Sequence, residues 1–244
     1  MSFVFEELDN QSSPLGEISL RRRSEPRLNN QIIFEVKLGD EFLMSSLFVE
    51  AEEQLSALGL AALKKNGHQK DLHIIIGGLG LGYTAVEALK DPGVKLMRVI
   101  DIMQPVISWH QRGLLPVGDI LATDPRSELV EGDFFKRATT SDAGFDQNNP
   151  QHKVHAVLLD IDHSPSHWLN DANQRFYTEE SLTKLAAKIC SGGVFALWSN
   201  ELPDTQFSDL LKRVFINCEA HTIPFPNPYT GEESYNSVYV ATVQ

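Results

Sequence analysis

The chain has 244 residues, 42% hydrophobic and 22% charged, the composition of an ordinary soluble globular protein with enough chain for a sizeable core. Its formal net charge of −12 argues against nucleic acid as the main partner, because two polyanions repel each other. Cys190 and Cys218 are too few for a disulfide framework and favour a reducing, cytoplasmic setting. No apolar run reaches membrane-spanning length and no signal peptide is recognisable, so no membrane partner is expected.

Residues 1–49 are expected to form a small N-terminal β element. Residues 1–30 are polar, which predicts irregular structure, and the basic run Arg21-Arg22-Arg23 is interpreted as a solvated strand end. Residues 31–38 and 41–49 alternate well enough for two strands, with a hairpin turn signal between them. This hairpin is expected to act as a lid or as a dimerisation flap, and in the second case the chain would form a homodimer.

The main domain, residues 50–244, contains a glycine-rich turn between a strand and a helix. The apolar spacing of residues 50–65 predicts a helix, and residues 72–77 predict a buried strand. The turn that follows reads G-x-G-x-G through Gly78, Gly80 and Gly82, and Tyr83 takes the place of the last glycine of a dinucleotide-binding turn. This shortened pattern resembles the first motif of the class I S-adenosylmethionine-binding fold. The alternative is a tight connection that binds no ligand.

The second strand of the main domain, residues 94–102, carries an acid near its end. Asp101 follows Gly82 at about the 20-residue interval at which nucleotide folds place a carboxylate on the ribose hydroxyls. A carboxylate can accept both hydrogen bonds of a cis-diol. We therefore expect Asp101, with the adjacent Ile102, to belong to a nucleoside site; a solvated strand-end aspartate is the alternative.

A third strand, residues 127–131, follows a helix at residues 104–111 and leads into Gly132-Asp133-Phe134. Asp133 could accept a hydrogen bond from the amino group of an adenine ring while Phe134 stacks nearby. A plain helix N-cap explains Asp133 nearly as well. Residues 137–153 are polar and aperiodic, which predicts a long exposed loop.

The fourth strand, residues 154–160, ends at Asp160, at the edge where open α/β sheets bind ligands. Asp160 is the first candidate for orienting the substrate or acting as a base. His163 is the second candidate, because histidine titrates near neutral pH. Further candidates for the substrate pocket are an acid and three aromatic residues: Asp162, Trp168, Tyr177 and Trp198. The aromatic residues have an alternative role in the core.

A metal site near Asp160 is not expected. Asp162, His163 and His167 offer ligand atoms, and two histidines four residues apart on a helix can share one ion. Pro165 lies between these histidines and makes a regular helix doubtful. No downstream cluster completes a ligand set.

The remaining elements define the fold class. They are a helix at residues 176–188, a strand at 194–199, a helix at 204–213, and strands at 214–223 and 234–243. The segment between the last two strands is too short for a crossover helix, so these strands should be antiparallel. The prediction is an α/β, doubly wound, Rossmann-like sheet of seven strands, mostly parallel, with an antiparallel C-terminal hairpin, as in S-adenosylmethionine-dependent methyltransferases.

From about residue 31 to its end, the chain resembles the polyamine aminopropyltransferases, that is, the spermidine synthases and their relatives. The resemblance rests on the order of several short motifs: the N-terminal hairpin, the Gly78–Gly82 turn, Asp101, Asp124-Pro125-Arg126, Gly132-Asp133, Leu159-Asp160, Phe176-Tyr177 and Gly192-Gly193-Val194. That family uses decarboxylated S-adenosylmethionine. The resemblance implies that Asp101 binds ribose, that Gly132-Asp133 binds adenine, and that Asp160 helps to deprotonate the attacking amine.

Two family motifs are altered. The active loop of the family reads Asp-x-x-Asp-Pro, whereas here His163 stands three positions after Asp160 and Pro165 comes one residue late. The family's Asp-Glu-x-x-Tyr-His-Glu segment is missing, and the nearest stretch, residues 49–54, has neither tyrosine nor histidine.

The sequence thus favours a transferase that binds S-adenosylmethionine or its decarboxylated form, without a metal, and transfers an aminopropyl or methyl group to a small amine-like acceptor. One alternative is a small-molecule methyltransferase on the same scaffold. Another is a non-catalytic adenosyl-ligand-binding or dimeric interaction protein. Tyr83 makes an NAD-dependent oxidoreductase the least favoured interpretation.

Overall fold

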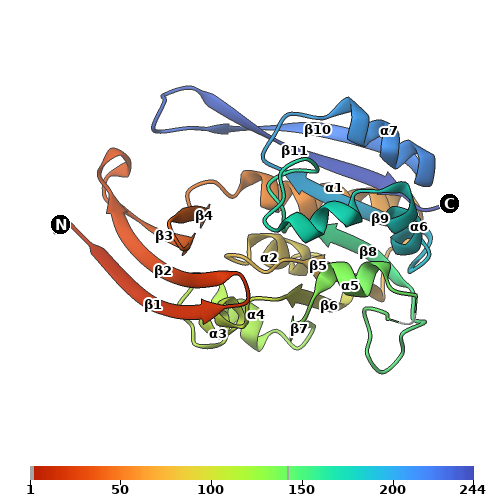
Figure 1. Cartoon of the computed structure of the whole chain (residues 1–244), viewed down its shortest axis with the longest axis horizontal. Coiled ribbons are helices and arrows are strands. Elements are labelled where there is room, and N and C mark those ends of the chain that lie inside the picture. Colours follow the sequence, from red (N-terminus) through yellow and green to blue (C-terminus); the bar gives the residue numbers. More distant parts are fainter. Residues whose placement is uncertain (1–2, 142) are drawn as a thin grey trace.

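The computed structural model describes residues 3–141 and 143–244, which form a small N-terminal sheet and a larger central sheet flanked by helices (Figure 1). The elements in chain order are β1 (Phe5–Ser13), β2 (Gly16–Glu25), η1 (Pro26–Leu28), β3 (Gln31–Leu38), β4 (Glu41–Ser45), α1 (Glu50–Lys65), β5 (Leu72–Gly77), α2 (Tyr83–Leu89), β6 (Val94–Asp101), α3 (Gln104–Gln111), α4 (Gly118–Thr123), β7 (Ser127–Glu131), α5 (Phe134–Thr139), β8 (Val154–Leu159), η2 (Asp171–Phe176), α6 (Glu179–Ala186), β9 (Ile189–Ser199), α7 (Thr205–Val214), β10 (Ile216–Pro226) and β11 (Glu233–Thr242).

The central sheet confirms the predicted fold class. Its seven strands follow the order β10-β11-β9-β8-β5-β6-β7, in which β9, β8, β5, β6 and β7 are parallel, β11 is antiparallel to β9, and β10 is antiparallel to β11. The inner strands β5 and β8 are almost entirely buried because helices cover both faces of the sheet. The order reverses between β5 and β8, and this switch point is where such sheets open a crevice for ligands.

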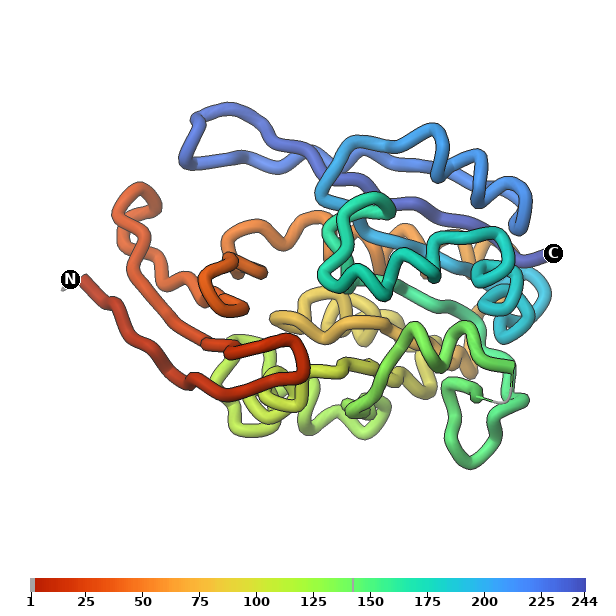
Figure 2. Tube along the Cα trace, viewed as in Figure 1, coloured from red at the N-terminus to blue at the C-terminus, as the bar shows by residue number. Residues whose placement is uncertain are grey.

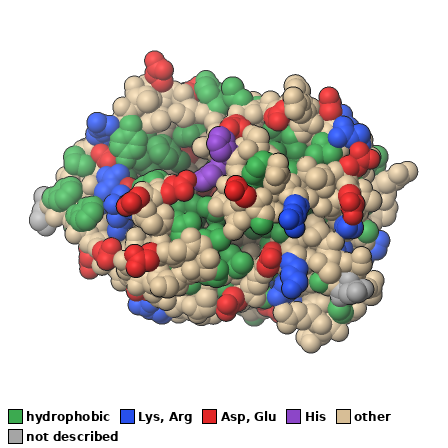
Figure 3. All heavy atoms as spheres, viewed as in Figure 1, with side chains coloured by type: hydrophobic (Ala, Val, Ile, Leu, Met, Phe, Trp, Pro, Cys, Tyr) green, Lys and Arg blue, Asp and Glu red, His purple; other side chains and the backbone are tan. Residues whose placement is uncertain are grey.

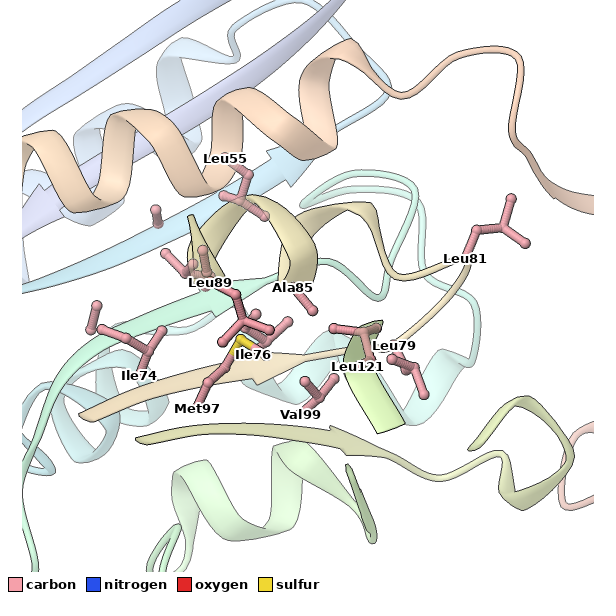
Figure 4. Close-up of a cluster of buried hydrophobic side chains, with 14 of the residues drawn as sticks. Leu55, Ile74, Ile76, Leu79, Leu81, Ala85, Leu89, Met97, Val99 and Leu121 are labelled. Carbon is pink, nitrogen blue, oxygen red and sulfur yellow. The ribbon is translucent and has the colours of Figure 1, made fainter. Parts of the chain in front are cut away.

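Two hydrophobic clusters hold the layers together. One face of the sheet packs against α1 to α4, and Figure 4 shows Leu55 of α1 and Ala85 of α2 above Ile76 of β5. The other face packs against α5, α6 and α7 through a second cluster that includes Phe134 and Phe195. No helix in the described part of the chain is long and apolar enough to cross a membrane.

The prediction of irregular structure for residues 1–30 is wrong, because β1 and β2 pair there and extend the N-terminal sheet to four strands. Strand β2 alternates: Ile18 and Leu20 are fully buried, with Ser19 between them. The basic run is not a solvated strand end either. Arg21 and Arg23 both contact Glu35 of β3, at 2.6 Å and 2.8 Å, and only 2% of Glu35 is exposed.

Residues 137–153 also depart from the prediction of an exposed loop. Helix α5 continues to Thr139, and Phe145 is buried with its ring stacked on that of Phe134, the centroids 5.8 Å apart. Asp146 forms an ion pair with Arg98 at 3.2 Å. Phe145 is a single buried apolar residue in a polar segment, and one such residue gives no periodic pattern from which its burial could be predicted.

The N-terminal sheet covers the edge of the central sheet at which its parallel strands end. Figure 2 shows β1 to β4 at this edge, with the β10–β11 hairpin reaching toward them from the other side. Tyr229, at the tip of that hairpin, accepts a hydrogen bond from Arg23 at 2.8 Å and donates one to Glu25 at 2.9 Å. Two segments far apart in sequence therefore enclose the strand ends from opposite sides.

Candidate functional site

A cavity of about 890 Å³, measured to the surrounding atoms and including its open mouth, lies between the N-terminal sheet and the ends of four parallel strands. Strands β5, β6, β7 and β8 contribute residues at or just after their C-terminal ends. Eight residues that line this first cavity are Gly78, Gly80, Asp101, Ile102, Gly132, Asp133, Phe134 and Asp160. The sequence analysis placed seven of them in the cofactor site and made Asp160 the first candidate for orienting the substrate or acting as a base, and the fold brings all eight together.

The glycine turn after β5 depends on missing side chains at two positions. Gly78 has φ +92°, and a Cβ there would lie 2.0 Å from the backbone oxygen of Asp160. Gly82, also at φ +92°, caps α2, and a Cβ there would lie 2.7 Å from the ring of His110. A larger residue at either position would have to push the backbone away from the neighbouring strand or helix. These glycines therefore fix the close packing under the cavity floor.

Asp101 links the glycine turn to the end of β6. One of its carboxylate oxygens accepts the N–H of Leu79 at 2.8 Å, and the other accepts the N–H of Met103 at 2.7 Å. Burial raises the pKa of Asp101, and its backbone hydrogen bonds oppose that shift. Because the two oxygens of a carboxylate can together accept about four hydrogen bonds, a ligand hydroxyl can still be bound beside these backbone contacts.

The end of β7 supplies the other side of the cavity. Asp133 caps α5 by accepting the N–H of Lys136 at 2.9 Å, so the cap interpretation holds, and Asp133 also lines the cavity. Ile102 is 39% exposed beside Asp101. Phe134 is 2% exposed and belongs to an aromatic group with Phe135 and Phe145, so its ring forms cavity wall and core together.

Asp160 lies between the first cavity and a second one. Its carboxylate accepts a hydrogen bond from Thr84 Oγ1 at 2.8 Å, and its N–H donates to Gly77 O at 2.8 Å. Burial raises the pKa of Asp160 to about 6. An acid with such a pKa can release or accept a proton near neutral pH, which is what a general base requires.

The second cavity, of about 1140 Å³ measured in the same way, shares five lining residues with the first: Leu43, Met44, Gly80, Asp160 and Ile161. Its polar and aromatic lining residues come from α1, α2 and the C-terminal strands as well: Glu52, Tyr83, His163, Trp198, Asn200, Phe225 and Asn236. Burial raises the pKa of Glu52 well above its usual range, and the charge of Asp160 raises it further. Trp198 has a buried indole Nε1 without a hydrogen-bond partner among the described residues.

The two cavities are lined by acids but not by cations. None of the described residues around either cavity is lysine or arginine, whereas Glu52, Asp101, Asp133 and Asp160 are present. Figure 3 shows a hollow on this face, with hydrophobic side chains inside it and histidine and acidic side chains around it. The site therefore suits a ligand that is apolar with a positive charge.

Three predicted substrate residues do not line either cavity. The carboxylate of Asp162 accepts hydrogen bonds from Leu169 N, Asn173 Nδ2 and Tyr177 Oη, each at 2.8 Å. Trp168 donates its Nε1 hydrogen to Pro165 O. Asp162, Trp168 and Tyr177 thus hold the loop after β8 in shape. By contrast, Trp198 and His163 do line the second cavity, with His163 Nε2 3.8 Å from Glu41.

Sequence reasoning missed two residues that the packing brings to the site. Glu52 lies in the stretch at 49–54, and its position opposite Asp160 follows only from the packing of α1. His110 is fully buried, and its Nε2 donates to Gly80 O at 2.9 Å, which supports the glycine turn from below. A helical histidine facing an apolar core gives no signal of this contact.

The fold is that of the spermidine synthases and of class I methyltransferases. A spermidine synthase in complex with the transition-state analogue AdoDATO matches with a TM-score of 0.71 at 18% identity, over 98% of this chain and 74% of that one. Spermidine synthase from Thermotoga maritima matches with 0.69 at 17% identity, over 98% and 73%. Human methyltransferase-like protein 13, in complex with SAH, matches with 0.59 at 16% identity, over 80% and 82%. No family model and no curated protein sequence matches this chain.

Proposed function

We propose that the protein is a spermidine-synthase-like transferase that moves the aminopropyl group of decarboxylated S-adenosylmethionine to a small amine. The observation that carries this proposal is the pair of joined cavities with Asp160 between them. A sulfonium nucleoside in the first cavity would have its reactive carbon close to the opening of the second. The two co-substrates would then meet in one orientation, which supplies much of the rate enhancement of a bimolecular transfer.

The nucleoside would be held by the ends of β5, β6 and β7. Asp101 would accept hydrogen bonds from the ribose hydroxyls through its free lone pairs. Asp133 and Phe134 would contact the adenine, and the glycine turn would lie against the sulfonium side chain. The fold neighbours with AdoDATO and SAH support a nucleoside of this type in this class of fold.

The charge of the cavities favours the decarboxylated co-substrate. S-adenosylmethionine carries a carboxylate, which would find no lysine or arginine among the described lining residues and would be repelled by Asp160 and Glu52. The decarboxylated form carries only positive charges near these acids. Charge complementarity therefore selects between two ligands that differ by one group.

In the transfer, the neutral amine nitrogen would attack the aminopropyl carbon bonded to sulfur. The C–N bond forms as the C–S bond breaks, the bonding pair stays on sulfur, and the leaving group is neutral methylthioadenosine. The amine must be unprotonated when it attacks, and Asp160, with a pKa of about 6, would take the proton. Glu52, across the second cavity, would hold the other positive charge of the acceptor, and that charge would oppose the rise in the pKa of Glu52 and favour its ionised form.

Product analysis tests this proposal. The purified protein is incubated with decarboxylated S-adenosylmethionine and a series of diamines, and in parallel with S-adenosylmethionine. Release of methylthioadenosine together with an aminopropylated amine supports the proposal. Release of S-adenosylhomocysteine would identify a methyltransferase, and binding without any product would identify a non-catalytic adenosyl-ligand-binding protein.

A further inference from the structure

A group of histidines and one cysteine lies at the opposite edge of the central sheet from the two cavities. His68 follows α1, His155 is the second residue of β8, and Cys190 is the second residue of β9. One potential ligand atom from each lies within 4.8 Å of the others. All three side chains are partly exposed, so an ion could reach them from solvent.

Two more histidines, His73 and His152, lie next to this cluster. The N–H of His73, on β5, donates to His155 Nδ1 at 3.0 Å. The ring nitrogens His73 Nδ1 and His152 Nε2 are hydrogen-bonded at 2.8 Å. Four of the eight histidines of the chain are thus gathered at one place, and the proposed cavities use none of them.

We propose that His68, His155 and Cys190 form a binding site for a zinc ion, with a water or a neighbouring histidine as the fourth ligand. Imidazole and thiolate are the ligands that Zn²⁺ prefers in proteins, and three protein ligands with one open position are common. Adjacent parallel strands fix two of the three ligands, which limits the ordering that an ion has to impose. Neighbours that orient the histidine rings are typical of such sites.

Zinc binding would exchange existing hydrogen bonds for metal bonds. His68 Nε2 donates to Ser191 O at 3.0 Å and lies 4.0 Å from Cys190 Sγ. His155 Nδ1 is occupied by the N–H of His73, so its ring must turn or give up that bond. Cys190 must lose its proton. These changes cost free energy, so we expect micromolar affinity and a protein that is folded with or without the ion.

The site would stabilise the edge of the sheet rather than take part in the transfer. It joins the segment after α1 to β8 and β9, where Asn66 Nδ2 already donates to Gly192 O at 2.9 Å. Because the ion would bind the folded chain only, it would raise the unfolding temperature with its concentration. The inference does not depend on the proposed transferase activity.

The test is a Zn²⁺ titration of reduced, metal-stripped protein against a chromophoric chelator. We expect one equivalent to bind, and Cys190→Ser, His155→Gln and His68→Asn to weaken binding at least tenfold. The matched controls Cys218→Ser and His221→Gln, which alter a cysteine and a histidine on β10, should bind as the unchanged protein does. With Co²⁺, a thiolate charge-transfer band should appear in the unchanged protein and in Cys218→Ser, but not in Cys190→Ser.

Thermal unfolding without metal shows whether each variant is folded, and His68→Asn, in a connecting segment, serves as a second variant if a strand variant fails. Two results would overturn the site. One is the absence of stoichiometric Zn²⁺ binding to the unchanged protein. The other is equal binding by the three ligand variants, which would mean adventitious surface histidines.

Discussion

Asp101 has two tasks at the residue scale, because its carboxylate already holds the glycine turn before any ligand binds. We predict that Asp101→Ala weakens methylthioadenosine binding at least roughly tenfold, about 1.4 kcal/mol, the scale of a charge-assisted hydrogen bond. Isothermal calorimetry measures this. Glu131→Gln, at an exposed position at the end of β7, is the control that should bind normally. Unchanged affinity of Asp101→Ala would remove this residue from the site.

Asp160 is expected to lower the stability of the fold where it is ionised. Its pKa is about 6 in the folded chain against 3.8 for an ordinary aspartate, mainly because it is buried. The folded chain therefore holds more protons between these values, and stability falls as the pH rises through this window. We predict that Asp160→Asn raises the free energy of unfolding at pH 7.5 by roughly 1–3 kcal/mol, and gives no gain near pH 3.5.

Urea unfolding at the two pH values checks this prediction, with Asp40→Asn, at an exposed position in the turn after β3, as the control. Asp160→Asn should also abolish the transfer, and turnover of the unchanged protein should rise with pH through about 6. A less stable Asp160→Asn protein at pH 7.5 would show that the carboxylate is better accommodated than its burial indicates.

Substitution of Glu52 should affect binding of the acceptor but not of the nucleoside, because Glu52 lines only the second cavity. We predict that Glu52→Gln raises KM for the amine acceptor about tenfold, because a neutral amide loses the attraction to a cation. Affinity for methylthioadenosine should not change. Glu53→Gln is the matched control, because the neighbouring Glu53 lines neither cavity. If the affinity for methylthioadenosine falls while the acceptor KM rises, the assignment of the two co-substrates to separate cavities is wrong.

At the scale of elements, Arg23 and Glu25 of the N-terminal sheet contact Tyr229 of the β10–β11 hairpin, and the role of this contact can be tested. Arg23 lowers the pKa of Glu25 to about 2, chiefly through its hydrogen bond, so this pair stays ionised at any ordinary pH. Tyr229 joins both residues from the hairpin, and its ring meets that of Phe48 at 6.3 Å. Phe48 also contacts the ring of Phe225, with centroids 5.2 Å apart, and both of these residues line the second cavity.

We predict that Tyr229→Phe raises the acceptor KM roughly two- to tenfold, the effect of about 0.5–1.5 kcal/mol for a lost hydrogen bond. Steady-state kinetics measures it. Tyr235→Phe is the matched control, because that hydroxyl donates to Glu233 at the same exposed end of β11. Equal effects of the two variants would mean that the enclosure of the cavity does not depend on this contact.

Local patterns in the sequence were sufficient for α1 and α3, and they failed for β1 and β2. The period of α1 is set by its own buried face, so the prediction over residues 50–65 is confirmed. Strand β2 places arginines on a protected face, where Glu35 neutralises them, and this partner lies twelve or more residues away. A charge that is buried through a distant partner looks, from sequence alone, like a charge in water.

At the scale of the whole molecule, some residues of the site follow from local sequence motifs, and others are placed only by tertiary packing. Gly78, Asp101, Asp133 and Asp160 could be predicted together because the ends of parallel strands must meet at one edge. Glu52 and Asn236 could not, because they reach the second cavity from a helix and an antiparallel strand whose packing no local motif encodes. The acceptor side of the site is thus a product of tertiary structure.

The central claim is that an adenosyl sulfonium compound lies across the ends of β5, β6 and β7. A crystal structure of the protein with decarboxylated S-adenosylmethionine tests it most directly. We predict ribose density within hydrogen-bonding distance of Asp101, adenine beside Asp133, and the aminopropyl group pointing toward Asp160. Density elsewhere on the molecule, or a first cavity filled by the side chains of Leu43 and Met44, would contradict the account.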